Sequence, residues 1–373
     1  MKVLMTDQLL KTETHYYKPY VRYIVSDYEL DEIIVKAPKT ETHWSSFASY
    51  ERRYGGQDLN GKKLCIYRHN AWGDQLIASA LPRYLKMLYP HSLIHLYCHP
   101  DVMPLWIGNS FLEGSAIPIP IPFDVAKNYD YHLFFEGMLE GNSEPDQDCC
   151  YDDMFAFAGH KDVPDAYKRP CVFPHPEDYQ ALGRLGLQGL TSKPFILYHA
   201  APANMNRCYP VEKGMKACRA LAHAFGVPVL VVGHDRKNEY GEVFNDSPEL
   251  GVFNFINKTK NFRELIPLVE RASLVVCPDS AILHLTACFP HVPSISLWGP
   301  FHPSNRSKYY PNDHPLGPHH VCPHAPCFDH NFFLPREQCK DAKHAPPEDK
   351  IKWCQVLNSI TPEDIVELAG TLL

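Results

Sequence analysis

The sequence lacks the features that mark membrane, exported and nucleic-acid-binding proteins. No apolar run approaches the ~18–20 residues of a membrane span, and the opening MKVLMTDQLLKTETHYY has no long apolar stretch of a secretion signal. No lysine/arginine run is present, the formal charge is −7 and the pI is near 6.3. We therefore expect a cytoplasmic protein without a membrane span. The net negative charge disfavours nucleic acid as a partner. Only a local basic cleft would favour binding of nucleic acid again.

Common catalytic motifs are also missing. There is no P-loop, and no G-x-G-x-x-G follows an apolar run. No G-x-S-x-G and no H-E-x-x-H occurs. These absences exclude the usual P-loop NTPases, dinucleotide-dependent dehydrogenases, α/β-hydrolases and zincins.

What is present indicates a two-domain globular enzyme. At 373 residues the chain exceeds the size at which a single core stops growing. Thirteen cysteines are scattered along it, and without an export signal we expect most to be reduced thiols in the cytosol.

Short apolar runs alternate with amphipathic stretches from residue 63 onward, which predicts parallel βαβ units and an α/β fold. The expected strands are 63–68, 93–98, 131–136, 195–200, 228–233, 273–277 and 293–299, and the expected helices are 75–89, 211–225, 262–272 and 280–289. Thr361 is the expected N-cap of a last helix. The expected parts are an extension (1–60), a first Rossmann-like domain (61–188), a second one with a Cys/His-rich tail (189–355) and a terminal helix (356–373).

Two acidic residues stand where a buried strand gives way to a helix. Asp74 follows the first strand, and Asp279 precedes Ser280 after a later one. Aspartate is among the best N-caps, so capping is the ordinary interpretation of both. The functional alternative makes Asp74 a general base at a cleft and Asp279 an acceptor of hydrogen bonds from sugar hydroxyls. Ser280 and nearby N–H groups would then hold a diphosphate.

Two cationic or titratable residues also have two interpretations. Arg207, in YHAAPANMNRCYP, is either a surface arginine or a fork for phosphate oxygens. His284, five residues after Asp279, is either a satisfied core histidine or part of a phosphate site.

Cysteines and histidines gather near the end of the chain. Cys322, Cys327, Cys339 and Cys354 follow the spacing C-x4-C-x11-C-x14-C, which differs from the tight CxxC pairs of zinc ribbons. They are either reduced thiols or the ligands of a structural zinc ion.

From about residue 59 to the C-terminus, the sequence resembles glycosyltransferase family 9, the heptosyltransferase-like enzymes of the GT-B fold. The resemblance is carried by KLCIYRHNAWGDQLIASALPRYL, HAAPANMNRCYP, VVGHDRKNE and DSAILHL, followed by VPSISLWGP. It implies two Rossmann-like domains whose parallel sheets face a central cleft, with residues 1–60 as an extension outside the resemblance.

The resemblance also implies residue roles. It assigns the catalytic base to Asp74 and places Trp72 and Arg68 on the acceptor side. The donor-binding residues that it implies are Arg207, Asp279, Ser280, Ala281, His284 and, on the ribose, Asp235 or Glu239. Three residues depart from the family pattern: Ala281 replaces the usual glycine, Arg207 the commoner lysine, and Trp72 a smaller aliphatic residue.

The implied activity is inverting, metal-independent transfer of a sugar from an ADP-, UDP- or GDP-sugar to an acceptor hydroxyl, with no other cofactor. The implied acceptor is a lipopolysaccharide-type or other surface glycan. One alternative is a viral-type transferase acting on a modified DNA base. Another is a non-catalytic nucleotide-sugar-binding protein with a zinc-stabilised tail.

Overall fold

The computed structural model describes residues 1–12, 15–26, 29–30, 33, 44–49, 52–135, 149–201, 207–235, 244, 247–327 and 354–373. The chain divides into two compact units, one of residues 1–141 and 150–168 and the other of residues 142–149 and 169–373. Residues 169–188, predicted with the first domain, thus fall in the second unit. Each unit is built around its own parallel sheet.

The parallel sheet of the first unit has the strand order β10-β6-β7-β8. Its strands are β6 (Lys63–Tyr67), β7 (Leu93–Cys98), β8 (Ile117–Pro118) and β10 (Tyr131–Phe134). The helix predicted over 75–89 is divided into α2 (Trp72–Ala78) and α3 (Ala80–Leu88). Pro82 accounts for the division, because it has no N–H to donate to the carbonyl of Ala78.

The N-terminal extension forms an antiparallel sheet of its own. The order is β5-β1-β4-β9, from β1 (Lys2–Thr6), β4 (Arg22–Val25), β5 (Trp44–Ser49) and β9 (Ile121–Pro122). Strand β9 comes from the middle of the first unit and pairs Ile121 with Ile24. A hairpin of β2 (Leu10–Lys11) and β3 (Tyr16–Tyr17) completes the extension.

Buried contacts tie this extension to the Rossmann-like sheet. Glu29 is 5% exposed and accepts hydrogen bonds from the hydroxyls of Tyr17 and Tyr67, the second at 3.0 Å. Tyr67 belongs to β6, and it shares a core with Ile24 and Ile121. The extension is therefore packed into the first unit.

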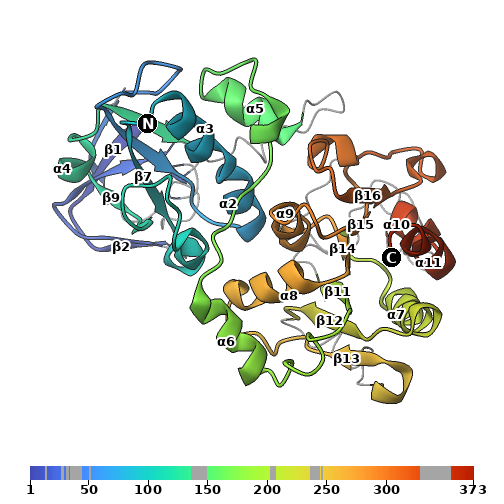
Figure 1. Ribbon diagram of the computed structural model, residues 1–373. Coiled ribbons are helices and arrows are strands. Elements are labelled where there is room, and N and C mark those ends of the chain that lie inside the picture. Colours follow the sequence, from blue (N-terminus) through green and yellow to red (C-terminus); the bar gives the residue numbers. More distant parts are fainter. Residues whose placement is uncertain are drawn as a thin grey trace. The chain divides into compact units, whose positions relative to one another are not determined.

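The second unit contains a six-stranded, fully parallel sheet in the order β13-β12-β11-β14-β15-β16 (Figure 1). The strands are β11 (Ile196–Ala201), β12 (Val229–Gly233), β13 (Val252–Asn254), β14 (Leu274–Pro278), β15 (Ser294–Leu297) and β16 (Asp313–Leu316). This is the 3-2-1-4-5-6 order of a Rossmann sheet, whose order reverses between β11 and β14.

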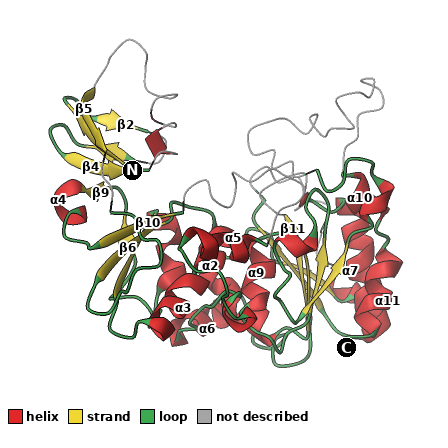
Figure 2. Ribbon diagram, turned by 90° about the horizontal axis from the view of Figure 1, so that it is seen from above, coloured by secondary structure: helices red, strands yellow, loops and turns green. Residues whose placement is uncertain are grey.

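Helices cover both faces of the six-stranded sheet. Figure 2 shows α7 (Val211–Phe225) with α11 (Pro362–Gly370) on one face and α9 (Ala281–Ala287) on the other. The predicted cap of α11 is confirmed: Thr361 and Asp364 form a reciprocal capping box.

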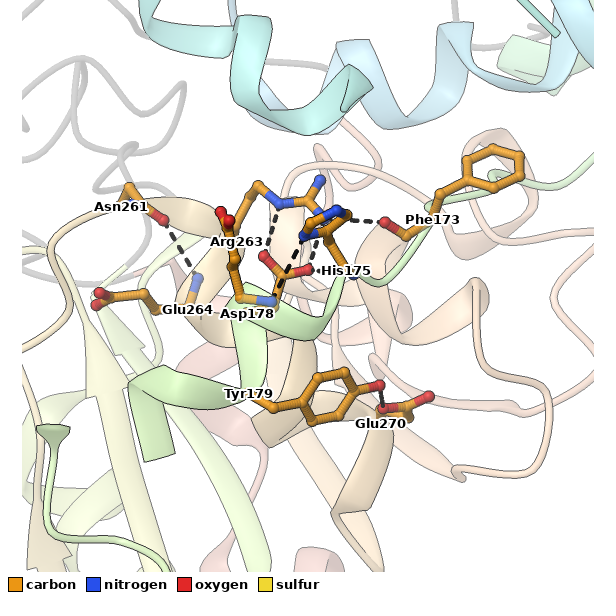
Figure 3. Close-up of polar contacts among 9 residues, drawn as sticks. Phe173, His175, Asp178, Tyr179, Asn261, Arg263, Glu264 and Glu270 are labelled. Carbon is orange, nitrogen blue, oxygen red and sulfur yellow. Dashed lines mark hydrogen bonds and ion pairs between the residues drawn. The ribbon is translucent and has the colours of Figure 1, made fainter. Parts of the chain in front are cut away.

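Helix α6 (Pro176–Arg184) is held to α8 (Ile266–Arg271) and to the preceding 3₁₀ turn (Phe262–Leu265) by buried polar contacts (Figure 3). The guanidinium of Arg263 pairs with both carboxylate oxygens of Asp178, at 2.7 and 2.5 Å. Tyr179 donates to Glu270, and Arg184 pairs with Glu264. These contacts fix α6 to the second unit.

The remaining helices are α4 (Phe123–Ala126), α5 (Cys150–Phe157) and α10 (Gln355–Ser359), with further 3₁₀ helices at Pro100–Trp106, Asp165–Tyr167, Pro248–Leu250, Pro303–Asn305 and His319–Val321. Among the described residues, we find no helix whose length and apolar content would let it span a bilayer.

Candidate functional site

The carboxyl edge of the six-stranded sheet gathers the donor-side residues expected from the sequence. In open α/β sheets, ligands bind where the strand order reverses, here between β11 and β14. Arg207 follows β11, whereas Asp279 and Ser280 follow β14. Residues 202–206, between β11 and Arg207, lie outside the described residues.

Arg207 and Asp279 pair across this reversal. Nη1 of Arg207 lies 3.4 Å from Oδ2 of Asp279, and the two side chains are 17% and 4% exposed. The capping interpretation of Asp279 is wrong, because the N-cap of α9 is Ser280. Asp279 therefore presents its carboxylate to Arg207 at the strand ends.

Ser280 contacts a histidine that no sequence motif predicted. Its Oγ lies 3.0 Å from Nδ1 of His199, a residue of β11, and makes no capping bond to α9. Burial lowers the pKa of His199 to about 4, so the ring is neutral at pH 7. The pair joins β11 to the start of α9 by a neutral hydrogen bond.

His284, one turn into α9, is buried at the same edge. Its Nδ1 lies 2.7 Å from the hydroxyl of Tyr310. Burial lowers the pKa of His284 to about 4; the nearby carboxylate of Asp279 opposes this shift, and the charges of Arg306 and Arg207 add to it. His284 is thus a neutral ring among three charged groups. Ala281, the first residue of α9, is partly exposed beside it.

Asp235 lies at the end of the neighbouring strand β12. It is 5% exposed, and its N–H donates to Oδ1 of Asn257 at 2.8 Å. Nδ2 of Asn257 donates back to the carbonyl of Asp235 at 2.9 Å. This reciprocal pair fixes the backbone at Asp235, whereas Glu239, the alternative ribose ligand, lies outside the described residues.

A second reversal of strand order, in the first unit, lies between β6 and β10. Asp74 is the third residue of α2, whose N-cap is Ala71, so the capping interpretation of Asp74 is wrong as well. Its carboxylate pairs instead with the guanidinium of Arg68, at the end of β6. Arg68 also donates from Nη1 to the carbonyl of Phe135, after β10, at 3.0 Å.

Arg68 is held inside a hydrogen-bonded chain. The residue is 1% exposed, and its carbonyl accepts from Nε2 of Gln75 at 2.8 Å. Oε1 of Gln75 accepts in turn from the indole N–H of Trp106 at 2.8 Å. Asp74 remains 22% exposed, so the buried arginine holds a carboxylate that reaches the surface. Trp72, which opens α2, is half-buried.

Three histidines meet at the carboxyl ends of β6 and β7. The ring of His15, from the extension, lies 4.8 Å from that of His69 and 6.3 Å from that of His99. Burial and the neighbouring rings lower the pKa of His15 to about 4 and that of His69 to about 3. The extension thus reaches the sheet edge that carries Asp74.

Three of the four C-terminal cysteines lie among the described residues. Cys322, Cys327 and Cys354 are half-buried, and Cys339 lies outside the described residues. Within the described ranges, no three His, Cys, Asp or Glu side chains are arranged to hold a metal ion. The zinc interpretation of these cysteines stays a prediction.

The structure therefore brings the expected residues together in two sets. Arg207, Asp279, Ser280 and His284 share one edge of the second unit, with Asp235 at the next strand end. Arg68 and Asp74 share an edge of the first. His199 and Arg306 also lie at the edge of the second unit but were not predicted, because no local motif marks either residue.

Comparison with known proteins places the donor-side residues inside a region that matches a known family. The model of glycosyltransferase family 9 (heptosyltransferase) matches residues 160–332, which include the whole donor-side set. No curated protein matches the chain.

Three solved structures have a similar fold. A family 9 glycosyltransferase from Veillonella parvula has a TM-score of 0.61 and 14% identity over 85% of this chain and 98% of its own. The ADP-heptose lipopolysaccharide heptosyltransferase II of E. coli has a TM-score of 0.60 and 16% identity over 83% and 98%. The iron-containing dodecameric glycosyltransferase TibC from enterotoxigenic E. coli has a TM-score of 0.58 and 14% identity over 89% and 80%.

These likenesses confirm the predicted α/β fold with parallel sheets, as in GT-B glycosyltransferases. The family match confirms the resemblance drawn from the sequence. Residues 160–332 therefore carry a glycosyltransferase family 9 (heptosyltransferase) domain, and the protein is a glycosyltransferase.

Proposed function

We propose that the protein transfers a sugar, with inversion and without a catalytic metal ion, from a nucleotide-sugar to the hydroxyl of a surface glycan. One observation supports this most strongly. The polar set of Arg207, Asp279, Ser280 and His284 lies at the strand-order reversal of the second unit, inside the matched family region. This is where a Rossmann sheet binds a nucleotide.

In this proposal the second unit binds the donor. Arg207 contacts the diphosphate, and Asp279 both orients Arg207 and accepts hydrogen bonds from sugar hydroxyls. Asp235, fixed by Asn257, accepts from the ribose. A fixed cation is well suited to a diphosphate leaving group, whose charge grows as the glycosidic bond breaks.

The first unit supplies the base. Asp74 takes the proton of the acceptor hydroxyl while that oxygen attacks the anomeric carbon from the face opposite the diphosphate. Arg68 is a positioning residue in this scheme: it is buried, and its guanidinium holds one oxygen of Asp74 and the carbonyl of Phe135. Trp72, beside Asp74 on α2, contributes to the acceptor side.

The donor to test first is ADP-heptose, because one protein of similar fold is an ADP-heptose heptosyltransferase. A thermal-shift screen of ADP, UDP, GDP and their sugars identifies the base, since a ligand that binds the folded state raises the melting temperature. We expect one diphosphate series to raise it and the matching sugar to be consumed with an acceptor glycan. No shift and no consumption with any of these donors would contradict the proposal.

A further inference from the structure

The loop after β15 brings a second arginine to the donor edge. The chain leaves β15 at Leu297, and the backbone N–H of Trp298 donates to the carbonyl of Leu316 at 2.8 Å. Phe301 is then buried, and a 3₁₀ turn (Pro303–Asn305) ends at Arg306, which is 9% exposed. The loop is thus anchored in the sheet before it presents Arg306.

The guanidinium groups of Arg207 and Arg306 both lie close to the aromatic ring of Phe301. The Cζ of Arg207 lies 5.1 Å from the centroid of its ring, and the Cζ of Arg306 lies 5.4 Å from the same centroid. Such a contact is attractive, and it strengthens as the cation is removed from water. Two arginines from separate loops are therefore fixed around one aromatic ring.

The charges of both arginines act on the ring of His284. Arg306 and Arg207 both lower its pKa, whereas Asp279 raises it. Two guanidinium groups, one carboxylate and a neutral imidazole thus share this edge. Among these side chains the positive charges outnumber the negative, which suits an anion with more than one charge.

We propose that Arg306 is a second diphosphate-binding residue, which holds phosphate oxygens of the donor through two parallel N–H···O bonds. The inference rests on the proposed function and adds a residue beyond the family signature, which ends at Gly299-Pro300. The planar fork of arginine matches phosphate geometry in a way that lysine does not.

Arg306 acts on the leaving group. The bond between the anomeric carbon and the β-phosphate oxygen breaks, and its electron pair stays on that oxygen. The acceptor oxygen bonds to the anomeric carbon, and its proton passes to Asp74. Arg306 and Arg207 then face a diphosphate with one more negative charge, so their contacts strengthen as the bond breaks.

The test compares ADP with adenosine in titration calorimetry, with UDP and uridine and GDP and guanosine in parallel. Arg306→Gln should weaken binding of the diphosphate about 10- to 100-fold, because a hydrogen bond to a charged group contributes roughly 1.5–3 kcal/mol. Binding of the nucleoside should change less than about threefold. A merely structural role would weaken both alike. Arg219→Gln, at an exposed arginine of α7, is the matched control.

The outcomes separate this inference from the proposed function. If the wild-type protein binds no diphosphate and consumes no nucleotide-sugar, the proposed function fails. If the wild-type protein binds ADP and Arg306→Gln binds it equally well, only the role of Arg306 is overturned. Should Arg306→Gln not fold, Arg306→Lys decides: loss of ADP affinity by threefold or more supports the fork, and unchanged affinity overturns it.

Discussion

The carboxylate of Asp74 is paired with the guanidinium of Arg68, six residues earlier in the chain, and Arg68 is almost completely buried. The pair joins the end of β6 to the first turn of α2. The orientation of Asp74 is therefore set by a side chain that belongs to the core.

Asp74→Asn should lower turnover severely and leave donor binding intact. An amide keeps the shape of the carboxylate but cannot take the acceptor proton, and loss of a general base costs about 10²- to 10⁴-fold in rate. The residues proposed to bind the donor lie in the other unit, so affinity for ADP, UDP or GDP should stay within twofold. Initial rates and calorimetry measure the two effects. Asp101→Asn, at an exposed aspartate after β7, is the control. Full activity of Asp74→Asn would remove Asp74 from the mechanism.

Arg207→Ala should weaken binding of the nucleoside diphosphate by about 10- to 100-fold, since a charged hydrogen-bond partner of phosphate is lost. It also leaves the buried carboxylate of Asp279 without this cation. We expect the double variant Arg207→Ala/Asp279→Asn to recover thermal stability but not diphosphate affinity. Equal affinity of Arg207→Ala and the wild-type protein in calorimetry would contradict the assignment.

Transfer should continue in excess EDTA. Arginine side chains at the diphosphate can stabilise the leaving group as a bound metal ion does in other transferases. We expect the initial rate with chelator to stay within twofold of the rate with Mg²⁺. Metal analysis of the purified protein, with melting temperatures before and after chelation, reports separately on the C-terminal cysteines. A rate lost in EDTA and restored by Mg²⁺ would show that catalysis needs the metal.

The pair of Arg263 and Asp178 should be important for the stability of the second unit. Both side chains are at most 7% exposed, and Asp178 also accepts from the N–H of His175 at 2.8 Å (Figure 3). Removing one partner of a buried ion pair typically costs about 3–5 kcal/mol, because it strands the other charge. Arg263→Met should therefore lower the urea midpoint sharply. Arg219→Met, at an exposed site, should change stability by no more than about 0.5 kcal/mol; equal effects would rule out this role for the pair.

Stability should fall as the pH falls from 7 to 5. Burial lowers the pKa of His132 to about 4 from 6.5, so between these values the unfolded chain binds a proton that the folded chain does not. The contribution of the neutral ring is complete above pH 6.5 and is lost as the pH approaches 4. At about 1.4 kcal/mol per pKa unit, it amounts to at most about 3 kcal/mol.

Urea titrations at pH 7 and pH 5 test this dependence. We expect His132→Asn to reduce the loss between the two pH values and the exposed His91→Asn to leave it unchanged. A loss identical in both variants would show that His132 does not contribute to it. His15, His199 and His284, whose pKa values are also lowered to about 4, should add to the slope of the wild-type protein.

The sequence predicted the parallel strands well because they are continuous apolar runs between turns. β6, β7, β11, β12 and β14 lie where the pattern placed them. The break at Ser79 escaped prediction, because the amphipathic pattern continues across Pro82. The pairing within the extension also escaped prediction, because β4 pairs not only with β1 but also with β9, a two-residue strand almost one hundred residues later that leaves no local signal.

The positions of four residues that the family signature singled out could be predicted; their roles stay predictions. Asp74, Arg207, Asp279 and Ser280 are polar residues at the ends of buried strands, which the sequence shows directly. Arg306 and His199 carry no such local signal. Their place at this edge depends on the spatial order of the strands in the sheet, which the sequence does not show directly. Both capping interpretations failed for one reason: residue type favours a cap, but the backbone begins α2 at Trp72 and α9 at Ala281.

The pairing of β4 with β9 also bears on how the chain is synthesised. Strands β1 and β4 leave the ribosome roughly a hundred residues before β9, the edge strand that pairs with β4. During that interval Ile24 lacks the apolar neighbour that covers it in the finished protein. Until β9 is synthesised, the nascent chain exposes an unpaired, apolar edge of β4. Slow translation before Ile121 would prolong the period in which this edge can pair with another chain and aggregate.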